Sequence, residues 1–229
     1  NCRMNQKKVL DGFYDIISKH KIELFDFVAS ERTKHITLGI ENIFQEHNAS
    51  AVLRTCDCFG IQELHVIEKN NEFAINRDIA LGAGRWIDVH NYRSENPSED
   101  CMNLLKNQGY KIVATTPHTE AFTINDLPLE QPLAIFFGTE QDGLSESVLQ
   151  AADYQVKIPM FGFTESFNIS VSVAILLNTL RKRLVDSDIE WKLSQEEQTY
   201  LKIEWCKKIL RSGQALENEF NKQLLKKDL

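Results

Sequence analysis

Residues 133–144 read LAIFFGTEQDGL, an unbroken apolar run that passes into a polar loop with two glycines. An apolar run of this length, without alternation, is typical of a strand buried on both faces of a parallel sheet. A second such run, KIVAT, occupies residues 111–115. Segments with helical spacing lie between these runs and the other expected strands. The pattern therefore predicts an α/β fold with a mostly parallel sheet and flanking helices.

The remaining elements follow from the same periodicities. Strands are expected at residues 35–40, 63–67, 86–89, 111–115, 133–137 and 154–158. Helices are expected at residues 9–19, 49–59, 97–107, 146–152, 169–184 and 194–210. Asn48 is expected to cap the start of the helix over 49–59, and Gly60 to end it, because these residue types favour those positions.

The composition is that of an ordinary folded protein. Of 229 residues, 42% are hydrophobic and 26% are charged, which is enough apolar material for a core. No stretch approaches the roughly 18 apolar residues of a membrane span, and the opening NCRMNQKK lacks the apolar segment of a secretory signal. The five cysteines are scattered and odd in number, which favours a reducing cytoplasm. No Cys/His set has zinc-ligand spacing, so no metal is expected.

The net charge of −7 is distributed unevenly along the chain. Residues 1–34 carry 7 basic and 5 acidic side chains, residues 181–229 carry 11 and 9, and residues 35–180 carry 8 and 19. We therefore expect helical extensions at 1–34 and 186–229 on an acidic domain at 35–185. An acidic total argues against sequence-blind coating of nucleic acid but allows a local basic surface. The basic ends are also explained as solvated helix faces.

Three loops carry polar groups that suit a binding site. The first, HNASAVLR at 47–54, opens a helix, and the third, IPMFGFTESFNISVS at 158–172, frames serine and asparagine with phenylalanines. The second, FGTEQDGL at 137–144, is acidic and lacks the lysine of a phosphate-binding loop, which favours a cofactor with a positive centre. Taken singly, each loop is also explained as a helix cap or an ordinary strand-to-helix turn.

Taken together, these segments resemble a known family. HNASAVLRTCDCFG, FFGTEQDGL and IPMFGFTESFNISVSVAILL resemble, in this order, the three motifs of the SpoU branch of the SPOUT class of RNA 2′-O-ribose methyltransferases, especially its TrmH-type tRNA (guanosine-18) members. The resemblance covers about residues 35–185. It implies a deep C-terminal trefoil knot that binds S-adenosylmethionine, a homodimer, and methylation of guanosine 18 in the tRNA D-loop.

The resemblance also implies roles for individual residues. Cofactor contacts are implied for Thr115, Gly138, Ile158, Met160 and Phe167, the last of which stands where the family commonly has leucine. The implied catalytic set is Asn48, Arg54, Glu140, Ser166 and Asn168, with Glu140 favoured as a structural anchor. The implied RNA contacts are His47, Arg85, Arg181 and Arg183.

The role of Arg54 stays open between two hypotheses. It matches the family residue proposed to act on the ribose hydroxyl, but arginine normally stays protonated in proteins. Either its site depresses the pKa enough for it to act as a base, or it binds a phosphate and stabilises the alkoxide while phosphate or solvent takes the proton.

Other RNA targets, and one function that is not catalytic, are also compatible with the sequence. The same chemistry could act on the tRNA wobble ribose or on ribosomal RNA, and the scaffold could serve a non-catalytic RNA-binding or assembly protein. Wobble-specific relatives contain little more than the knot domain, and ribosomal ones often carry a separate N-terminal domain. Two short extensions therefore favour tRNA guanosine 18.

Overall fold

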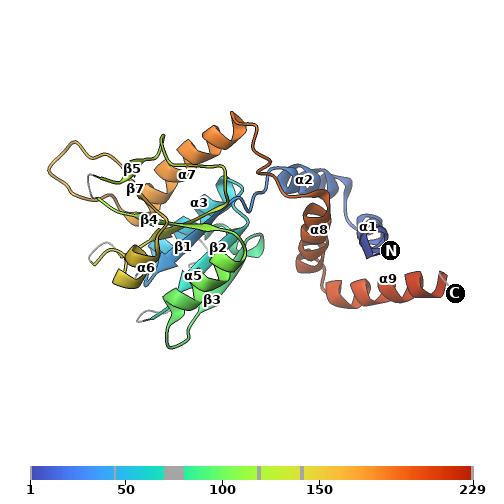
Figure 1. The fold of residues 1–229 in the computed structure, drawn as a ribbon. Helices are drawn as coiled ribbons and strands as arrows, with labels where there is room; N and C mark the ends of the chain where they lie inside the picture. The colour runs from blue at the N-terminus through green and yellow to red at the C-terminus, as the bar shows by residue number, and fades with distance from the viewer. Residues whose placement is uncertain (1, 44, 70–79, 118–119, 140–141, 228–229) are drawn as a thin grey trace. The chain divides into compact units, whose positions relative to one another are not determined.

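The computed structural model describes residues 2–43, 45–69, 80–117, 120–139 and 142–227. Within these residues lies a seven-stranded sheet in the order β3-β2-β1-β6-β4-β7-β5 (Figure 1). In chain order its strands are β1 Ile36–Glu41, β2 Glu63–Ile67, β3 Asp88–Tyr92, β4 Lys111–Thr115, β5 Phe122–Thr123, β6 Leu133–Phe137 and β7 Tyr154–Lys157. All of the paired strands run parallel. The predicted class of fold is confirmed.

Helices cover both faces of this sheet (Figure 1). They are α3 Glu46–Cys58, α5 Pro97–Asn107, α6 Glu146–Ala151 and α7 Ile169–Val185, with a short 3₁₀ helix, η1 Ala83–Arg85. The helices α3 and α7 contact each other and share one core layer, whereas α5 and α6 contact each other and share a second layer. A parallel sheet needs both faces covered in this way.

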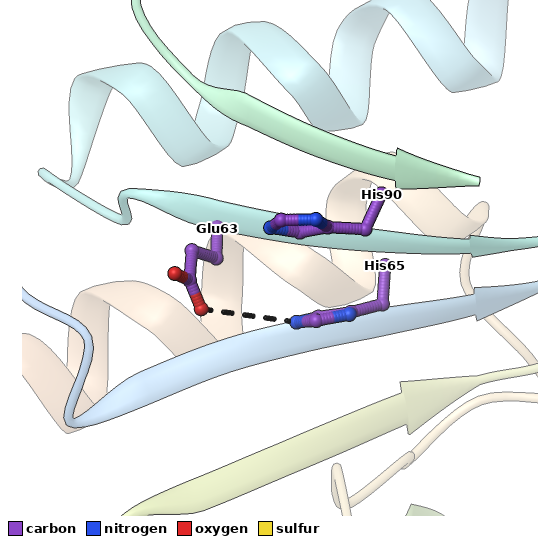
Figure 2. A group of neighbouring side chains, drawn as sticks. All are labelled: Glu63, His65 and His90. Atoms are coloured by element: carbon purple, nitrogen blue, oxygen red, sulfur yellow. Dashed lines mark ion pairs between the residues drawn. The ribbon is translucent and has the colours of Figure 1, made fainter. Parts of the chain in front are cut away.

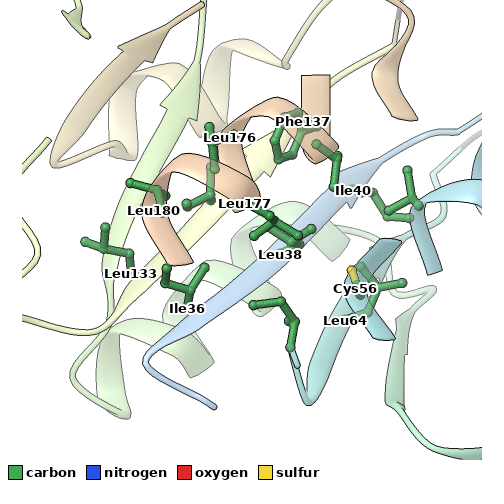
Figure 3. Packing of buried hydrophobic residues seen from close by; sticks show 14 of the residues in the cluster. Ile36, Leu38, Ile40, Cys56, Leu64, Leu133, Phe137, Leu176, Leu177 and Leu180 are labelled. Carbon is green, nitrogen blue, oxygen red and sulfur yellow. The ribbon is translucent and has the colours of Figure 1, made fainter. Parts of the chain in front are cut away.

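The central strands β1 and β6 place alternate side chains into the two core layers. Ile36, Leu38 and Ile40 pack on the layer of α3 and α7 (Figure 3), while Phe136 packs on the layer of α5 and α6. Gly39 pairs with Phe136 in the register, and a Cβ at Gly39 would lie 2.5 Å from the Phe136 ring. The runs predicted as buried strands at 111–115 and 133–137 are confirmed at both ends.

The chain divides into two compact units. Residues 33–191 form the unit described above, here called the sheet unit, and residues 1–32 and 192–229 together form the terminal unit. The terminal unit contains α1 Cys2–Tyr14, α2 Lys19–Ser30, α8 Gln195–Ile209 and α9 Gly213–Lys227. The two ends of the chain therefore fold with each other, and the division falls at 32/33 and 191/192, beside the expected boundaries at 34/35 and 185/186.

Aromatic side chains form the core of the terminal unit. Trp205 is 1% exposed and meets Phe25 edge to face, with ring centroids 5.4 Å apart. Phe13 and Phe220 make a second such pair at 5.2 Å, joining α1 to α9. The helix α8 begins with a capping box at Ser194, which satisfies backbone N–H groups at its first turn. No helix in the described ranges is long and apolar enough to cross a membrane.

Some predicted boundaries in the terminal unit are wrong. The helix expected over 9–19 is interrupted, because α1 ends at Tyr14 and Ser18 caps a new helix, α2, by accepting a hydrogen bond from the Lys21 backbone N–H. The sequence pattern does not predict α2 or α9. Both helices contact other helices of the same unit, α2 packing on α8 and α9 on α1 and α8.

Two boundaries in the sheet unit also differ from prediction. Asn48 is not an N-cap, because α3 begins at Glu46 and its cap residue is Gln45, so that Asn48 lies in the first turn. The strand expected at 86–89 is shifted toward the C-terminus and is β3. Gly60, with φ at 73°, follows the end of α3 as predicted, in the left-handed conformation that glycine adopts without strain.

Candidate active site

A pocket of about 440 Å³ lies at the carboxyl ends of three neighbouring strands, β6, β4 and β7. Its volume falls in the range of roughly 300–1,000 Å³ that is usual for small-molecule sites. In open α/β sheets, ligands bind outside this edge of the sheet. Six of the residues selected from the sequence line the pocket, namely Thr115, Gly138, Ile158, Met160, Ser166 and Phe167.

The pocket combines apolar walls with acidic groups. Its apolar lining comes from Phe137, Leu144 and Leu176, among others, and its carboxylates come from Asp142 and Glu165. Among the described lining residues there is no lysine, arginine or histidine. Such a lining is poorly suited to a triphosphate and well suited to a ligand that carries a positive charge.

The loop after β6 is held closed by its own backbone. Thr139 and Gly143 exchange two backbone hydrogen bonds of 3.1 Å, and the Thr139 hydroxyl accepts a bond from the Asp142 N–H. A Cβ at Gly138 would lie 2.0 Å from the backbone carbon of Gly143, so only glycine allows this approach. Glu140, expected as an anchor, lies outside the described residues.

A hydrogen bond joins the first and third predicted loops across 120 residues of sequence. The Asn168 side chain caps α7 by accepting hydrogen bonds from the N–H and hydroxyl of Ser170, and its Nδ2 donates to Asn48 Oδ1 at 2.9 Å. Asn48 is buried and donates in turn to Gln45 at 3.3 Å. This bond links the loop that lines the pocket to the start of α3.

The cationic residues of the first loop face solvent. His47 and Arg54 are both exposed on α3, on either side of the buried Asn48 along the chain. The helix α3 packs against α7, whose first residue, Ile169, also lines the pocket. Arg54 is therefore available to a large ligand such as a nucleic acid, while Asn48 is occupied with the protein itself.

The remaining predicted RNA contacts differ in their surroundings. Arg85 is exposed in η1, which contacts α3. The Arg181 guanidinium lies 3.8 Å from the centroid of the Trp191 ring, a cation–π contact. Arg183 donates to the backbone carbonyls of Ile124 and Leu127 at 2.6 and 2.8 Å. Contacts within the protein thus hold the guanidinium groups of Arg181 and Arg183 in place. RNA binding by these two residues stays a prediction.

One buried carboxylate near the site was missed by reasoning from the sequence. Glu41, at the end of β1, is 3% exposed and accepts hydrogen bonds from the Ser98 hydroxyl and from both the N–H and the hydroxyl of Ser145. Ser145 is the residue that directly precedes α6, after the loop that lines the pocket. A single acidic residue at a strand end carries no recognisable signal, so only the fold reveals this anchor.

The second and third predicted loops line a pocket at the carboxyl edge of the parallel sheet. The hydrogen bond between Asn168 and Asn48 joins the third loop to the first. This is the architecture expected of the family suggested by the motifs. The chain belongs to the SpoU rRNA methylase family, whose model matches residues 35–178. Individual relatives support this assignment over most of the chain.

One relative is the tRNA (guanosine(18)-2′-O)-methyltransferase of Borreliella burgdorferi, which is 40% identical over 213 residues, 93% of this chain and 95% of that protein. The crystal structure of a TrmH/SpoU tRNA modifying enzyme from A. aeolicus is similar with a TM-score of 0.75 and 26% identity, covering 84% of this chain and 98% of that one. The SpoU methyltransferase AviRb from Streptomyces viridochromogenes, solved with AdoMet, shares the fold at 20% identity and a TM-score of 0.60, covering 68% of this chain and 63% of that one.

Proposed function

We propose that this chain is an enzyme that methylates a ribose 2′-hydroxyl of RNA with S-adenosylmethionine, and that its target is guanosine 18 in the D-loop of tRNA. The observation that carries the proposal is that the second and third loops line one pocket, while the bond from Asn168 to Asn48 ties the third loop to the helix that bears Arg54. Membership of the family supports the reaction, and the relative named for guanosine 18 supports the target.

The charge and the apolar surface of the pocket suit S-adenosylmethionine. Asp142 and Glu165 provide negative charge for a cationic cofactor, and Ile158, Met160 and Phe167 provide apolar surface for its flat ring system. Thr115 and Gly138 would complete the contacts from the ends of β4 and β6. When bound there, the cofactor supplies an electrophilic methyl group, so the protein does not have to activate the donor.

Two tasks then fall to the residues of this chain. The first is alignment of the ribose, which can lower a barrier by roughly 7–11 kcal/mol in well-oriented systems. Ser166 at the pocket and the Asn168–Asn48 bond are suited to hold the reacting groups in register. The second is control of the hydroxyl proton. A charged Arg54 binds a substrate phosphate through its planar fork and stabilises the developing alkoxide, while phosphate or solvent takes the proton.

RNA contacts in this proposal come from exposed cations. His47, Arg54 and Arg85 face solvent on α3 and on the neighbouring η1. The terminal unit adds 14 basic side chains against 11 acidic ones. Arg181 and Arg183 add RNA contacts from the end of α7, where Trp191 and two backbone carbonyls fix their guanidinium groups.

The proposal includes a homodimer that works in the cytoplasm, with the C-terminal part of the sheet unit threaded into a deep trefoil knot, as the family resemblance implies. Phe161 and Phe163 are 97% and 108% exposed in the loop before α7, and Val171 in its first turn is also exposed. Apolar side chains gathered in this way mark an interaction surface. A second copy of the chain would cover them, and Phe163→Asp should shift the sedimenting species from dimer to monomer.

Methyl transfer to defined transcripts tests the reaction and the target together. The full chain is incubated with methyl-labelled S-adenosylmethionine and a tRNA transcript carrying guanosine 18, and with a matched transcript carrying adenosine there. The expected result is one labelled 2′-O-methyl group, mapped to position 18 of the first transcript alone. Label at the wobble ribose or in ribosomal RNA would contradict the target, and absence of cofactor binding would contradict the enzyme.

A further inference from the structure

A second cluster of titratable side chains lies outside the pocket, on β2 and β3 (Figure 2). Glu63 and His65 occupy alternate positions of β2, and His90 stands directly opposite His65 in the register. One ligand atom from each residue lies within 4.8 Å of those of the other two. Both imidazole rings extend toward the Glu63 carboxylate (Figure 2). Glu63 begins β2, so the cluster lies toward the amino ends of the strands, whereas the pocket lies at their carboxyl ends.

His65 is the fixed member of this cluster. It is 2% exposed, and its Nδ1 lies 2.9 Å from the Tyr92 hydroxyl. Its Nε2 is buried and has no hydrogen-bond partner among the described residues. The nearest Glu63 carboxylate oxygen is 4.0 Å from this nitrogen, which is too far for a hydrogen bond. A buried polar atom without a partner costs about 1–3 kcal/mol, so a group that bridges the gap would stabilise the fold.

We propose that Glu63, His65 and His90 bind a divalent metal ion of the Zn²⁺ class, with water completing its coordination. Zinc bonds are about 2.0–2.2 Å long to histidine nitrogen and carboxylate oxygen, so two ligands of one ion lie roughly 3.4 Å apart in a tetrahedron and up to about 4.2 Å apart on opposite sides. The 4.0 Å gap between His65 and Glu63 is about 0.6 Å longer than the tetrahedral spacing, so the Glu63 carboxylate has to move toward His65 when the ion binds.

The surroundings of the cluster support a metal site. His90 is exposed and Glu63 is partly exposed, so both can adjust by side-chain rotation while Tyr92 holds His65 in place. Lys34 contacts the other Glu63 oxygen at 2.9 Å, which leaves the second oxygen facing His65.

The ion would join β2 to β3, which is one of the two edge strands of the described sheet. Its role is therefore structural, and methyl transfer is expected to proceed without it. Because the two histidines meet only through strand register, the spacing of residues along the sequence gives no sign of this site.

Metal titration of the tag-free full chain, stripped with a chelator, tests the proposal. We expect calorimetry with ZnCl₂ to give one ion per chain and Co²⁺ to give a visible absorption band that Zn²⁺ abolishes. His90→Gln alters an exposed side chain and should weaken Zn²⁺ binding at least about 100-fold while the far-ultraviolet spectrum stays native. Glu63→Gln should act in the same direction.

His20→Gln is the matched control, because His20 is exposed on α2 in the terminal unit and belongs to no such cluster among the described residues. It should bind Zn²⁺ as the wild type does. Failure of the wild type to bind one ion would overturn the proposal. The proposal would also be overturned if His20→Gln and His90→Gln lowered the Zn²⁺ affinity equally, or if neither variant lowered it. None of these outcomes depends on methyl transfer.

Discussion

The two compact units of this chain differ in construction and in charge. The sheet unit, residues 33–191, surrounds buried parallel strands, contains the pocket, and carries 12 basic and 22 acidic side chains. The terminal unit, residues 1–32 and 192–229, is built from helices of both chain ends and carries 14 basic and 11 acidic side chains. In the proposed function this contrast corresponds to a division of labour, with cofactor and chemistry in the acidic unit and attraction of phosphate in the basic one.

Electrostatics explains why such a division is useful. An acidic pocket favours a cationic cofactor, but the same charge repels RNA at distances within the Debye length of about 8 Å at physiological salt. A separate basic unit can raise the affinity for RNA without placing cations in the cofactor pocket. Substitutions confined to one unit should therefore affect one role without the other.

The sharpest test uses one glycine from each unit. A Cβ at Gly138 would lie 2.0 Å from the Gly143 backbone carbon, and a Cβ at Gly213 would lie 2.4 Å from the Cα of Lys207. Gly138→Ala should force open the loop at the pocket and abolish measurable binding of S-adenosylmethionine in calorimetry. Gly213→Ala should leave that binding unchanged and lower tRNA affinity in filter assays, because it separates α8 from α9.

The third loop offers a matched control for this pair. A Cβ at Gly162 would meet no atom within 4 Å, so Gly162→Ala should retain both cofactor and tRNA binding. If Gly138→Ala bound the cofactor as tightly as Gly162→Ala, the loop after β6 would not form part of the site. If Gly213→Ala weakened cofactor binding, the two units would not be functionally separate.

The second test separates chemistry from binding within the sheet unit. Arg54 is exposed on α3, so its replacement should not disturb the core. Arg54→Ala should lower kcat about 100-fold, because the charge that stabilises the alkoxide is removed, while cofactor affinity stays the same. Arg54→Lys should recover only part of the rate, since an ammonium cannot form the bidentate contact.

Single-turnover methylation of a guanosine-18 transcript over a range of pH measures this effect. A literal base with a depressed pKa would give Arg54→Lys a shifted pH profile, whereas a phosphate-binding role would leave the profile in place and lower the rate at every pH. An Arg54→Ala variant with most of its kcat intact would contradict both roles.

The sheet unit was far easier to predict than the terminal unit, for a physical reason. Strand positions that are buried on both faces of a sheet have to be apolar, so LAIFF and the central IVA of KIVAT mark β6 and β4 from the sequence alone. The helix α2 has only two buried residues, Phe25 and Ala29, and packs against α8, which is far away in sequence. The periodicity of a short segment cannot indicate a partner helix, such as α8, that is distant in sequence.

The candidate site shows the same limit. The motifs identified Asn48 and Asn168, but the bond between them, and the fact that Asn48 is no helix cap, follow from how α3 and α7 pack. The sequence predicts Arg183 to be a surface cation, but its guanidinium donates hydrogen bonds to two backbone carbonyls of a segment that is distant in sequence. Residue type predicts chemistry, whereas the partners of each residue depend on the fold.

The third test concerns the basic charge of the terminal unit. Lys208 and Arg211 are exposed at the end of α8 and after it. Lys208→Glu with Arg211→Glu should lower tRNA affinity about tenfold and reduce the salt dependence of binding by about one unit for each phosphate that the protein no longer neutralises. Lys106→Glu, an exposed change on α5 of the sheet unit, should have little effect. Equal decreases in the two variants would assign RNA binding to net charge rather than to the terminal unit.

The smallest expected effect is a difference in alkylation rate between one buried thiol in each unit, which reports how often each unit opens. Burial raises the pKa of Cys101 in the sheet unit and of Cys206 in the terminal unit to about 12, so both thiols stay protonated at pH 8 and react only when their unit opens. Cys58 is exposed on α3 and should be alkylated first. Timed alkylation read by mass spectrometry should then find Cys206 before Cys101, because the smaller helical unit buries less apolar surface and opens more often. Simultaneous labelling of the two buried thiols would mean that the units unfold together, and the separation of roles would then rest on charge alone.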